Sequence, residues 1–453
     1  MGSQCMAVRT VAAGVLAAAL GNMSHGNEAF AQQFMVLYTF CSQPNCADGS
    51  RPVAGLTRGK RGALYGTTNV GGGGGNGTAF KLTPPVSEGD PWTETVLYSF
   101  CSLMRCADGY NPAFRLLMRR GALYGTTPYG GANNGGTVFE LTRPATAGNS
   151  WTETVLHSFC SLSNCADGVD PQGNLIMDGE GALYGVTQYA AGGNRGGTVF
   201  KLTPPTAEGN SWTETVLYNF CSLSSCADGD GPRAGLLIDR QGALYGTAQF
   251  GGIQGGGLVF KLTPPSMTGG LWAETVLYRF CSVLNCTDGA YPQASLIMDS
   301  RGALYGTTVN GGIFGANVIG GSPGQGTVFK LTPPTVSGNP WTETVLYRFC
   351  SRAYCADGAI PASRLVIDQY GALYGTTQSG GNDGLSGTIF KLTPPAVMDG
   401  PWTETVLHSF CSLQSCADGA QPNGDLIMHQ GVLYGTTNTG PNNGGGTVFK
   451  LTP

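Results

Sequence analysis

Short apolar segments separated by Gly, Pro, Asn and Asp recur along the chain at a spacing of about 60 residues. One copy contains four such segments, at 175–177, 182–185, 198–202 and 213–220. Their lengths and the turn residues between them predict four short β-strands. The third and fourth segments carry apolar residues on both faces, which predicts a sheet packed between two others. No helical periodicity of useful length follows residue 31.

The repeat occurs seven times. Six copies contain a Trp, at positions 92, 151, 212, 272, 341 and 402, so the steps are 59, 61, 60, 69 and 61 residues. All seven contain Leu-Tyr-Gly, centred on Tyr65, Tyr124, Tyr184, Tyr245, Tyr305, Tyr374 and Tyr434. A four-stranded unit of this size is typical of a β-propeller blade, with a linear solenoid or a string of disulfide-bonded beads as alternatives.

The two ends of the chain favour the propeller. Residues 36–40 match the fourth strand of the repeat, and residues 446–453 match the third. In a ring the N-terminal strand completes the last blade, whereas a solenoid would need atypical caps and beads would not need the split. We therefore predict an all-β fold over residues 32–453, a seven-bladed β-propeller of four-stranded blades closed by its N-terminal strand.

Residues 1–31 have the pattern of a signal peptide. Arg9 precedes an apolar stretch at 11–20, and the small-x-small sequence at 29–31 fits a cleavage site. A stretch of ten residues is too short to span a bilayer, which needs about 20. The sequence thus predicts a secreted, monomeric protein without a membrane span, located outside the cell or in the periplasm.

Composition narrows the function further. The chain of 453 residues has 73 Gly and 26 Pro, is only 11% charged and has a formal net charge of −4. A disordered charged tail, a coiled coil and a basic nucleic-acid binder all need charge that is absent here. We therefore expect no nucleic-acid partner.

The 15 cysteines predict disulfides. Cys5 lies in the predicted signal peptide, and the remainder form one C-x4-C pair after each fourth strand. The pairs are Cys41 with Cys46, Cys101 with Cys106, Cys160 with Cys165, Cys221 with Cys226, Cys281 with Cys286, Cys350 with Cys355, and Cys411 with Cys416. Zinc needs four ligands, and these pairs lack nearby His and the C-x2-C spacing. An oxidising compartment favours local disulfides, so no metal and no cofactor is predicted.

In every pair, one residue separates the second Cys from an Asp-Gly sequence. The aspartates are Asp48, Asp108, Asp167, Asp228, Asp288, Asp357 and Asp418. One carboxylate per loop is few for calcium, which takes six to eight oxygens, so we interpret these residues as caps of turns. The Gly-rich loops between the second and third strands lack the Gly-Lys-Ser/Thr ending of a phosphate-binding loop.

Positions that differ between blades are the candidates for a ligand site. One lies two residues after the second strand and is aromatic in three adjacent blades, as Tyr129, Tyr189 and Phe250. The corresponding loop of the fifth blade, 311–326, is nine residues longer than usual and adds Phe314. A third set precedes the first strand, near the predicted channel mouth, and includes Arg115, Arg364 and Asp425. Aromatic faces beside polar groups suit sugar rings; alternatively, these aromatics pack neighbouring loops together.

The sequence gives little support for an enzyme. Of the three histidines after residue 31, His157 and His408 replace a Tyr of the fourth strand, and no nucleophile-base pattern occurs. The glutamates repeated on that strand look structural. A lyase or hydrolase using Asp425 and Arg115, and a purely structural extracellular protein, are retained as alternatives to a carbohydrate- or protein-binding scaffold.

The run Gly-Ala-Leu-Tyr-Gly-Thr-Thr, then Gly-Gly, then Gly-Thr-Val-Phe-Lys-Leu-Thr-Pro resembles the GloVer (Gloeo/Verruco) tandem-repeat family of exported bacterial proteins. The similarity covers nearly all of residues 35–453 in seven copies. It implies a bacterial, exported protein with a propeller-like repeat fold, and it implies no catalytic residues.

Overall fold

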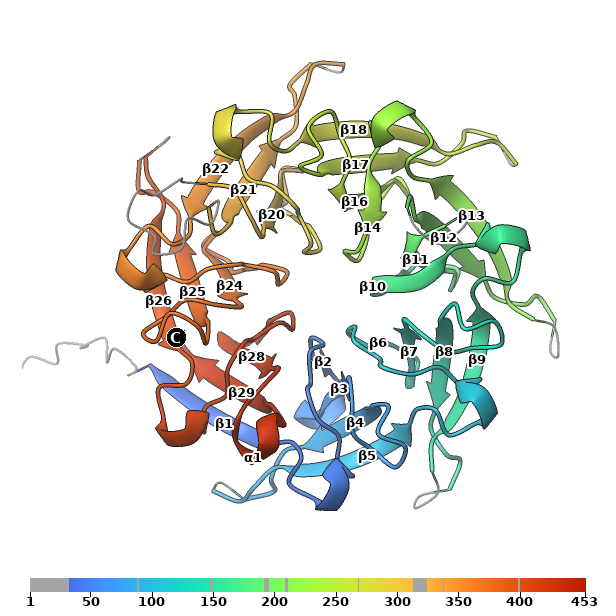
Figure 1. Cartoon of the computed structure of the whole chain (residues 1–453), viewed down its shortest axis with the longest axis vertical. Helices are drawn as coiled ribbons and strands as arrows, with labels where there is room; N and C mark the ends of the chain where they lie inside the picture. Colours follow the sequence, from blue (N-terminus) through green and yellow to red (C-terminus); the bar gives the residue numbers. More distant parts are fainter. Residues whose placement is uncertain are drawn as a thin grey trace, which may run out of the picture. The chain divides into compact units, whose positions relative to one another are not determined.

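Seven antiparallel sheets follow one another around a ring in the computed structural model (Figure 1). The structure describes residues 32–453 except 88, 147–149, 191–194, 208–210, 268, 313–323, 337 and 398–399. Residues Gln32–Pro453 form one compact unit. The predicted seven-bladed propeller is confirmed for this unit, whereas the predicted signal peptide lies outside the described residues.

The strands of each blade are given from the channel outward. Blade 1 contains β2 (Thr57–Arg58), β3 (Leu64–Thr68), β4 (Thr78–Thr83) and β5 (Thr93–Ser99). Blade 2 contains β6 (Leu117–Arg119), β7 (Ala122–Thr127), β8 (Thr137–Thr142) and β9 (Thr152–Ser158). Blade 3 contains β10 (Val169–Met177), β11 (Leu183–Tyr189), β12 (Thr198–Thr203) and β13 (Thr213–Asn219). Blade 4 contains β14 (Asp230–Pro232) and β15 (Leu237–Ile238), then β16 (Leu244–Phe250), β17 (Leu258–Thr263) and β18 (Ala273–Arg279).

Blade 5 contains β19 (Ile297–Met298), β20 (Leu304–Thr308), β21 (Thr327–Thr332) and β22 (Thr342–Arg348). Blade 6 contains β23 (Val366–Ile367), β24 (Leu373–Thr377), β25 (Thr388–Thr393) and β26 (Thr403–Ser409). Blade 7 contains β27 (Ile427–His429), β28 (Val432–Thr437), β29 (Thr447–Thr452) and β1 (Gln33–Thr39). The one described α-helix is α1 (Pro441–Gly444), and none of the described helices is long and apolar enough to cross a membrane.

The N-terminal strand closes the ring. β1 pairs antiparallel with β29, from Gln33 opposite Thr452 to Thr39 opposite Thr447. A buried apolar cluster then joins β1 and β29 to blade 1, through side chains such as Leu37, Phe40 and Leu82. Seven such clusters occur among the described residues, one at each blade-to-blade interface. Each sheet therefore buries both faces, as the apolar pattern of the third and fourth strands predicted.

A glycine in the second strand makes this packing possible. In blade 3, a Cβ built on Gly185 would lie 2.5 Å from the ring of Phe200 on the neighbouring strand. Phe200 is fully buried and meets Phe159 of blade 2 at a ring-centroid distance of 5.0 Å. The Gly of the Leu-Tyr-Gly motif is thus needed because the core phenylalanine packs directly against its backbone.

Six outer strands place a glutamate against the neighbouring blade. The residues are Glu94, Glu153, Glu214, Glu274, Glu343 and Glu404. Each has at least one buried carboxyl oxygen without a hydrogen-bond partner. Burial, joined by the charge of a nearby Asp, raises the pKa of Glu94 and Glu153 to about 8 and of the others to about 7. In β1 the corresponding residue is Phe34, which stacks on His408 at 3.8 Å.

The connections divide between two faces of the ring. The loops from each outer strand to the next inner strand, and those from the second to the third strand, emerge on what we call the loop face. The turns between the first and second strands, and the linkers from the third to the fourth strand, emerge on the turn face. Because neighbouring strands are antiparallel throughout, the two faces carry different sets of connections.

Candidate functional site

Each loop after an outer strand is built around one buried aspartate. In blade 1, Asp108 Oδ2 accepts hydrogen bonds from the Ser102 amide, the Ser102 hydroxyl and the Tyr98 hydroxyl at 2.8–2.9 Å. The Leu103 amide donates to Asp108 Oδ1 at 3.1 Å. All seven aspartates are at most 3% exposed, and each accepts bonds of this kind. The predicted role as turn caps is confirmed.

The seven predicted disulfides are present beside these aspartates. They join Cys41 to Cys46, Cys101 to Cys106, Cys160 to Cys165, Cys221 to Cys226, Cys281 to Cys286, Cys350 to Cys355, and Cys411 to Cys416. Both members of every pair have a backbone φ between 50° and 60°. Residues other than glycine rarely adopt this conformation, so the cross-link and the aspartate together hold each loop in an unusual shape.

Where His replaces the outer-strand Tyr, it takes over the contact with the capping aspartate. His408 Nε2 lies 3.0 Å from Asp418 Oδ2. Burial alone would raise the pKa of Asp418, but hydrogen bonds from His408, from the Ser412 hydroxyl and amide and from the Leu413 amide hold it at about 2. This histidine therefore supports a loop.

One group of potential metal ligands occurs in the part of the chain that the structure describes. It comprises Cys221, Cys226 and Asp230. Both sulfurs are committed to a disulfide and cannot ligate as thiolates. The group gives no basis for a metal site.

Besides the two cysteines, each loop has another residue with a positive φ, at a repeat position where the side chain differs from blade to blade. Three residues after each capping aspartate the backbone φ lies between 55° and 62°, at Arg51, Asn111, Asp170, Gly231, Tyr291, Ile360 and Gln421. This conformation costs about 1–2 kcal/mol for residues other than glycine, and it recurs here with a different side chain in every blade. Strain kept at such positions is typical of surfaces that bind ligands.

Two of the three predicted aromatics lie together. Tyr129 and Tyr189 line one cavity of about 560 Å³, which we call the side cavity, with Asp170, Gln172 and Arg233. Phe250 does not line it; its ring packs edge-on against Tyr291 at 5.5 Å. The predicted residue Phe314 lies outside the described residues.

The side cavity has an exposed aromatic residue, Tyr129. It is 46% exposed and meets Tyr110 at a centroid distance of 5.4 Å. Burial and the nearby charge of Asp170 raise the pKa of the Tyr129 hydroxyl, and Arg233 opposes the shift. Tyr129 therefore presents an uncharged hydroxyl and a free ring face at neutral pH.

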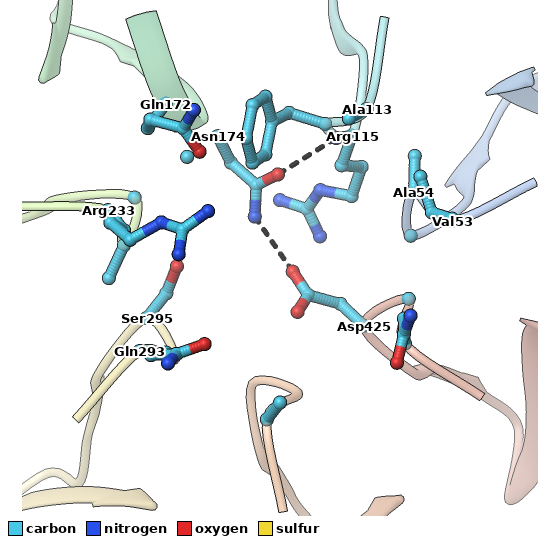
Figure 2. A pocket seen from close by; sticks show the side chains of 18 of the residues that line it. Val53, Ala54, Ala113, Arg115, Gln172, Asn174, Arg233, Gln293, Ser295 and Asp425 are labelled. Carbon is cyan, nitrogen blue, oxygen red and sulfur yellow. Dashed lines mark hydrogen bonds between the residues drawn. The ribbon is translucent and has the colours of Figure 1, made fainter. Parts of the chain in front are cut away.

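A second cavity, the central cavity, occupies the channel mouth with a volume of about 540 Å³. Figure 2 shows Arg115, Asn174, Arg233 and Asp425 pointing into it from four different blades. The two cavities share Tyr129, Gln172 and Arg233 in their walls. They form adjoining compartments on the loop face. The sequence analysis predicted a ligand site in this region.

A hydrogen-bonded bridge crosses the channel beneath the central cavity. Asn174 of blade 3 donates from Nδ2 to Asp425 Oδ2 of blade 7 at 2.7 Å, and its Oδ1 accepts the Arg115 amide at 2.9 Å (Figure 2). Asp425 Oδ1 accepts the Arg364 amide, also at 2.9 Å. The bridge joins blades 2, 3, 6 and 7 and gives the cavity a polar floor.

Two charged groups, Asp425 and Arg115, act on the guanidinium group of Arg364. Burial lowers the pKa of Arg364, the charge of Asp425 raises it, and the like charge of Arg115 lowers it. Both oxygens of Asp425 already accept hydrogen bonds, which suits a fixed structural carboxylate better than a proton-transferring one. The structure thus brings the predicted residues Arg115, Arg364 and Asp425 together.

Sequence reasoning missed several lining residues. The position after the Pro that recurs in every repeat reads Val53, Ala113, Gln172, Arg233, Gln293, Ala362 and Asn423, and all seven line the central cavity. This position varies between blades as strongly as the three sets considered above, and four of its seven residues are polar. The same criterion of blade-to-blade variation would have found it.

Fold and site together define a disulfide-reinforced seven-bladed β-propeller with a polar, aromatic-edged double cavity on its loop face. The model of the Gloeobacter/Verrucomicrobia repeat matches residues 28–226 and 309–453. The chain therefore belongs to this family, which confirms the resemblance found in the sequence. No curated protein matches the chain.

Solved structures to which this chain is similar include PorZ, described as an essential bacterial surface component of the type-IX secretion system of Porphyromonas gingivalis. It has 12% identity and a TM-score of 0.46 over 88% of this chain, which spans 46% of the PorZ chain. An endo-arabinase from Bacteroides thetaiotaomicron has 12% identity and a TM-score of 0.33, covering 69% of this chain and 96% of that one. Trypanosoma rangeli sialidase has 11% identity and a TM-score of 0.40, covering 82% and 57%.

Proposed function

We propose that this protein is an exported, non-catalytic binding scaffold that holds extracellular carbohydrate in the two cavities of its loop face. The observation that carries the proposal is the side cavity, where an exposed tyrosine ring stands beside amide and charged groups. A sugar places its C–H face on such a ring and its hydroxyls on the surrounding polar atoms.

The polar groups around Tyr129 suit hydroxyl recognition. Gln172 donates to Asp170 at 2.6 Å, and Arg233 contacts Gln249 Oε1 at 3.4 Å. These contacts orient the side chains and leave further donors and acceptors for a ligand. Asp170 and Arg233 supply both signs of charge, so a neutral sugar finds acceptors as well as donors.

Export is supported by the cysteines. Seven local disulfides are typical of an oxidising compartment. Such a loop of about six residues gains on the order of 2 kcal/mol from its cross-link in the chain-entropy model. The predicted signal peptide at 1–31 is consistent with the same route, and it stays a prediction.

A glycan array followed by titration calorimetry tests the proposal. We expect the chain to bind a subset of neutral or mildly acidic oligosaccharides. Replacing Tyr129 and Tyr189 by Ala removes the ring face and weakens binding by about tenfold or more, because losing 1.4 kcal/mol is a factor of ten.

Phe250→Ala is the matched control. Phe250 occupies the same repeat position and is 41% exposed, but it lies outside both cavities. Its variant retains wild-type affinity. Equal losses for Phe250→Ala and the double tyrosine variant, or release of shortened sugars during the assay, contradict the proposal, the second result in favour of the hydrolase or lyase alternative.

A further inference from the structure

The turn face breaks the symmetry of the ring in three consecutive blades. In blades 3 to 6 the turn after the inner strand opens with Asp178, Asp239, Asp299 and Asp368. Each accepts the hydroxyl of the Tyr on the next strand at 3.0–3.1 Å. In blades 7, 1 and 2 the same position holds His429, Gly59 and Arg119.

The turns that lack this aspartate also differ in net charge from the turns that have it. The turns at 59–62, 119–121 and 429–431 contain four Lys or Arg and no acid, and Arg58 directly precedes the first of them. The turns at 178–181, 239–242, 299–302 and 368–371 contain five acids and two Arg. Since the whole chain has a formal net charge of −4, the cations are concentrated against its overall charge.

Backbone geometry differs in the same blades. Arg120 and Gln430 have φ of 51° and 50°, each followed by a glycine with positive φ, which is the two-residue hairpin turn usually occupied by Asn-Gly. Arg61 of blade 1 also has a positive φ, of 56°. Two arginines thus occupy backbone positions that favour Asn or Gly.

The cations are exposed, and one of them borders a hollow. Arg58, Lys60, Arg61, Arg119 and Arg120, which we call the basic patch, are all exposed. Arg58 also lines a cavity of about 490 Å³ with Arg115 and His429. None of the ion pairs found among the described residues involves a member of the patch.

A further arginine reinforces the reversal. Arg143 of the blade 2 linker donates from Nη2 to the Tyr65 hydroxyl at 3.0 Å. The corresponding hydroxyls of blades 3 to 6 donate to an aspartate. In blade 2 the corresponding Tyr124 hydroxyl donates to Glu140 Oε1 at 2.8 Å, so a cation replaces the anion beside this tyrosine in blade 1 but not in blade 2.

We propose that the basic patch is a second binding site, on the face opposite the sugar cavities, for an anionic polysaccharide bearing sulfate or carboxylate groups. The cavity beside Arg58 takes one anionic group, and the turn-tip cations of blades 1 and 2 take its neighbours along the polymer. This site is independent of the loop-face function.

The shape and composition of the patch favour a polysaccharide over other polyanions. Its residues include no aromatic side chain on which nucleobases could stack, as they do in proteins that bind single strands. The cations lie on and beside exposed turns, and Arg58 borders a cavity, which suits a strand with projecting groups better than a flat lipid surface.

Affinity chromatography and fluorescence titration of the full chain test the site. We expect binding to dextran sulfate and polygalacturonate, weakening as salt rises, and no binding to neutral dextran. Lys60→Asp with Arg61→Asp weakens binding at least tenfold, and Arg58→Met, which places the residue of blades 2 and 3 there, weakens it severalfold.

Arg240→Asp with Arg301→Asp is the matched control. These residues occupy the positions of Lys60 and Arg61 in the turns of blades 4 and 5, and the charge change is identical. The control stays within twofold of wild type, and both double variants keep loop-face binding. The proposal is overturned if wild type ignores dextran sulfate, if both double variants weaken equally, or if phosphatidylglycerol vesicles or single-stranded DNA bind more tightly.

Discussion

The buried glutamates of the outer strands make the stability of the ring depend on pH. Glu153 has a pKa of about 8, raised from 4.5 by burial and then by Asp108. A carboxyl with a raised pKa binds its proton more tightly in the folded chain than in the unfolded one. The folded state therefore has its full advantage below about pH 4.5 and loses it as pH rises through about 8.

The size of the effect follows from the shift. A difference of 3.5 units corresponds to about 5 kcal/mol at 1.36 kcal/mol per unit. Glu153 is half-buried, so water screens part of this interaction and we expect about 1–2 kcal/mol. Six such positions, at about 1 kcal/mol each, amount to a large share of a total stability of 5–15 kcal/mol.

Thermal unfolding of Glu153→Gln, followed by circular dichroism from pH 5 to pH 9, measures this. Glutamine mimics the protonated acid, so the variant matches wild type at pH 5. At pH 9 it unfolds about 2 °C higher, since unfolding entropy is about 2 cal/mol/K per residue over some 420 residues. Glu180→Gln, at an exposed turn, is the control and leaves the profile unchanged.

Parallel profiles for Glu153→Gln and wild type across this range would refute the reasoning. They would mean that the carboxyl is ionised in the folded protein without cost. A lower melting temperature for the variant at pH 9 would refute it more strongly, because it would assign a stabilising role to the ionised form.

Three further changes test the fold and the channel. Gly185→Ala forces a methyl group into the core phenylalanine behind it and costs about 1–3 kcal/mol of unfolding free energy, measured by urea denaturation. Asp108→Asn removes a charge-assisted acceptor and costs about 2 kcal/mol, with increased proteolysis of its loop as a second readout. Asn174→Leu leaves Asp425 Oδ2 and the Arg115 amide without a partner, so it costs about 1–3 kcal/mol and speeds hydrogen exchange at that amide, whereas an unchanged exchange rate would argue against a closed bridge.

The sequence sufficed for the architecture because every blade repeats the same local signals. Turn glycines and the Leu-Tyr-Gly strand act over a few residues. β1 pairs with β29 as expected, although they lie far apart along the chain, because each one matches a strand of the repeat. The disulfides and the capping aspartates were predictable for the same reason, since their partners lie within ten residues.

The site was only partly predictable because it depends on contacts across the ring. Asn174 and Asp425 are 251 residues apart, and no local pattern couples them. Phe250 shares its repeat position with Tyr129 but turns to Tyr291 of the following blade. Strands β11 and β16 extend to Tyr189 and Phe250 because the incoming loops pair with them at Val169 and Asp230. Such differences arise from the neighbours that each loop meets in space.

The pairing of β1 with β29 sets the order in which this protein can be completed. A ribosome adds about 5–20 residues per second, so tens of seconds pass between synthesis of the two strands. Throughout that interval β1 has no partner in its own blade, although Leu37 and Phe40 can already pack on blade 1 side chains such as Phe80. Earlier blades can stack on one another as they emerge, but the first strand must wait for the last. The completing event is therefore the pairing of β1 with β29, which satisfies the backbone of both strands and closes the last blade.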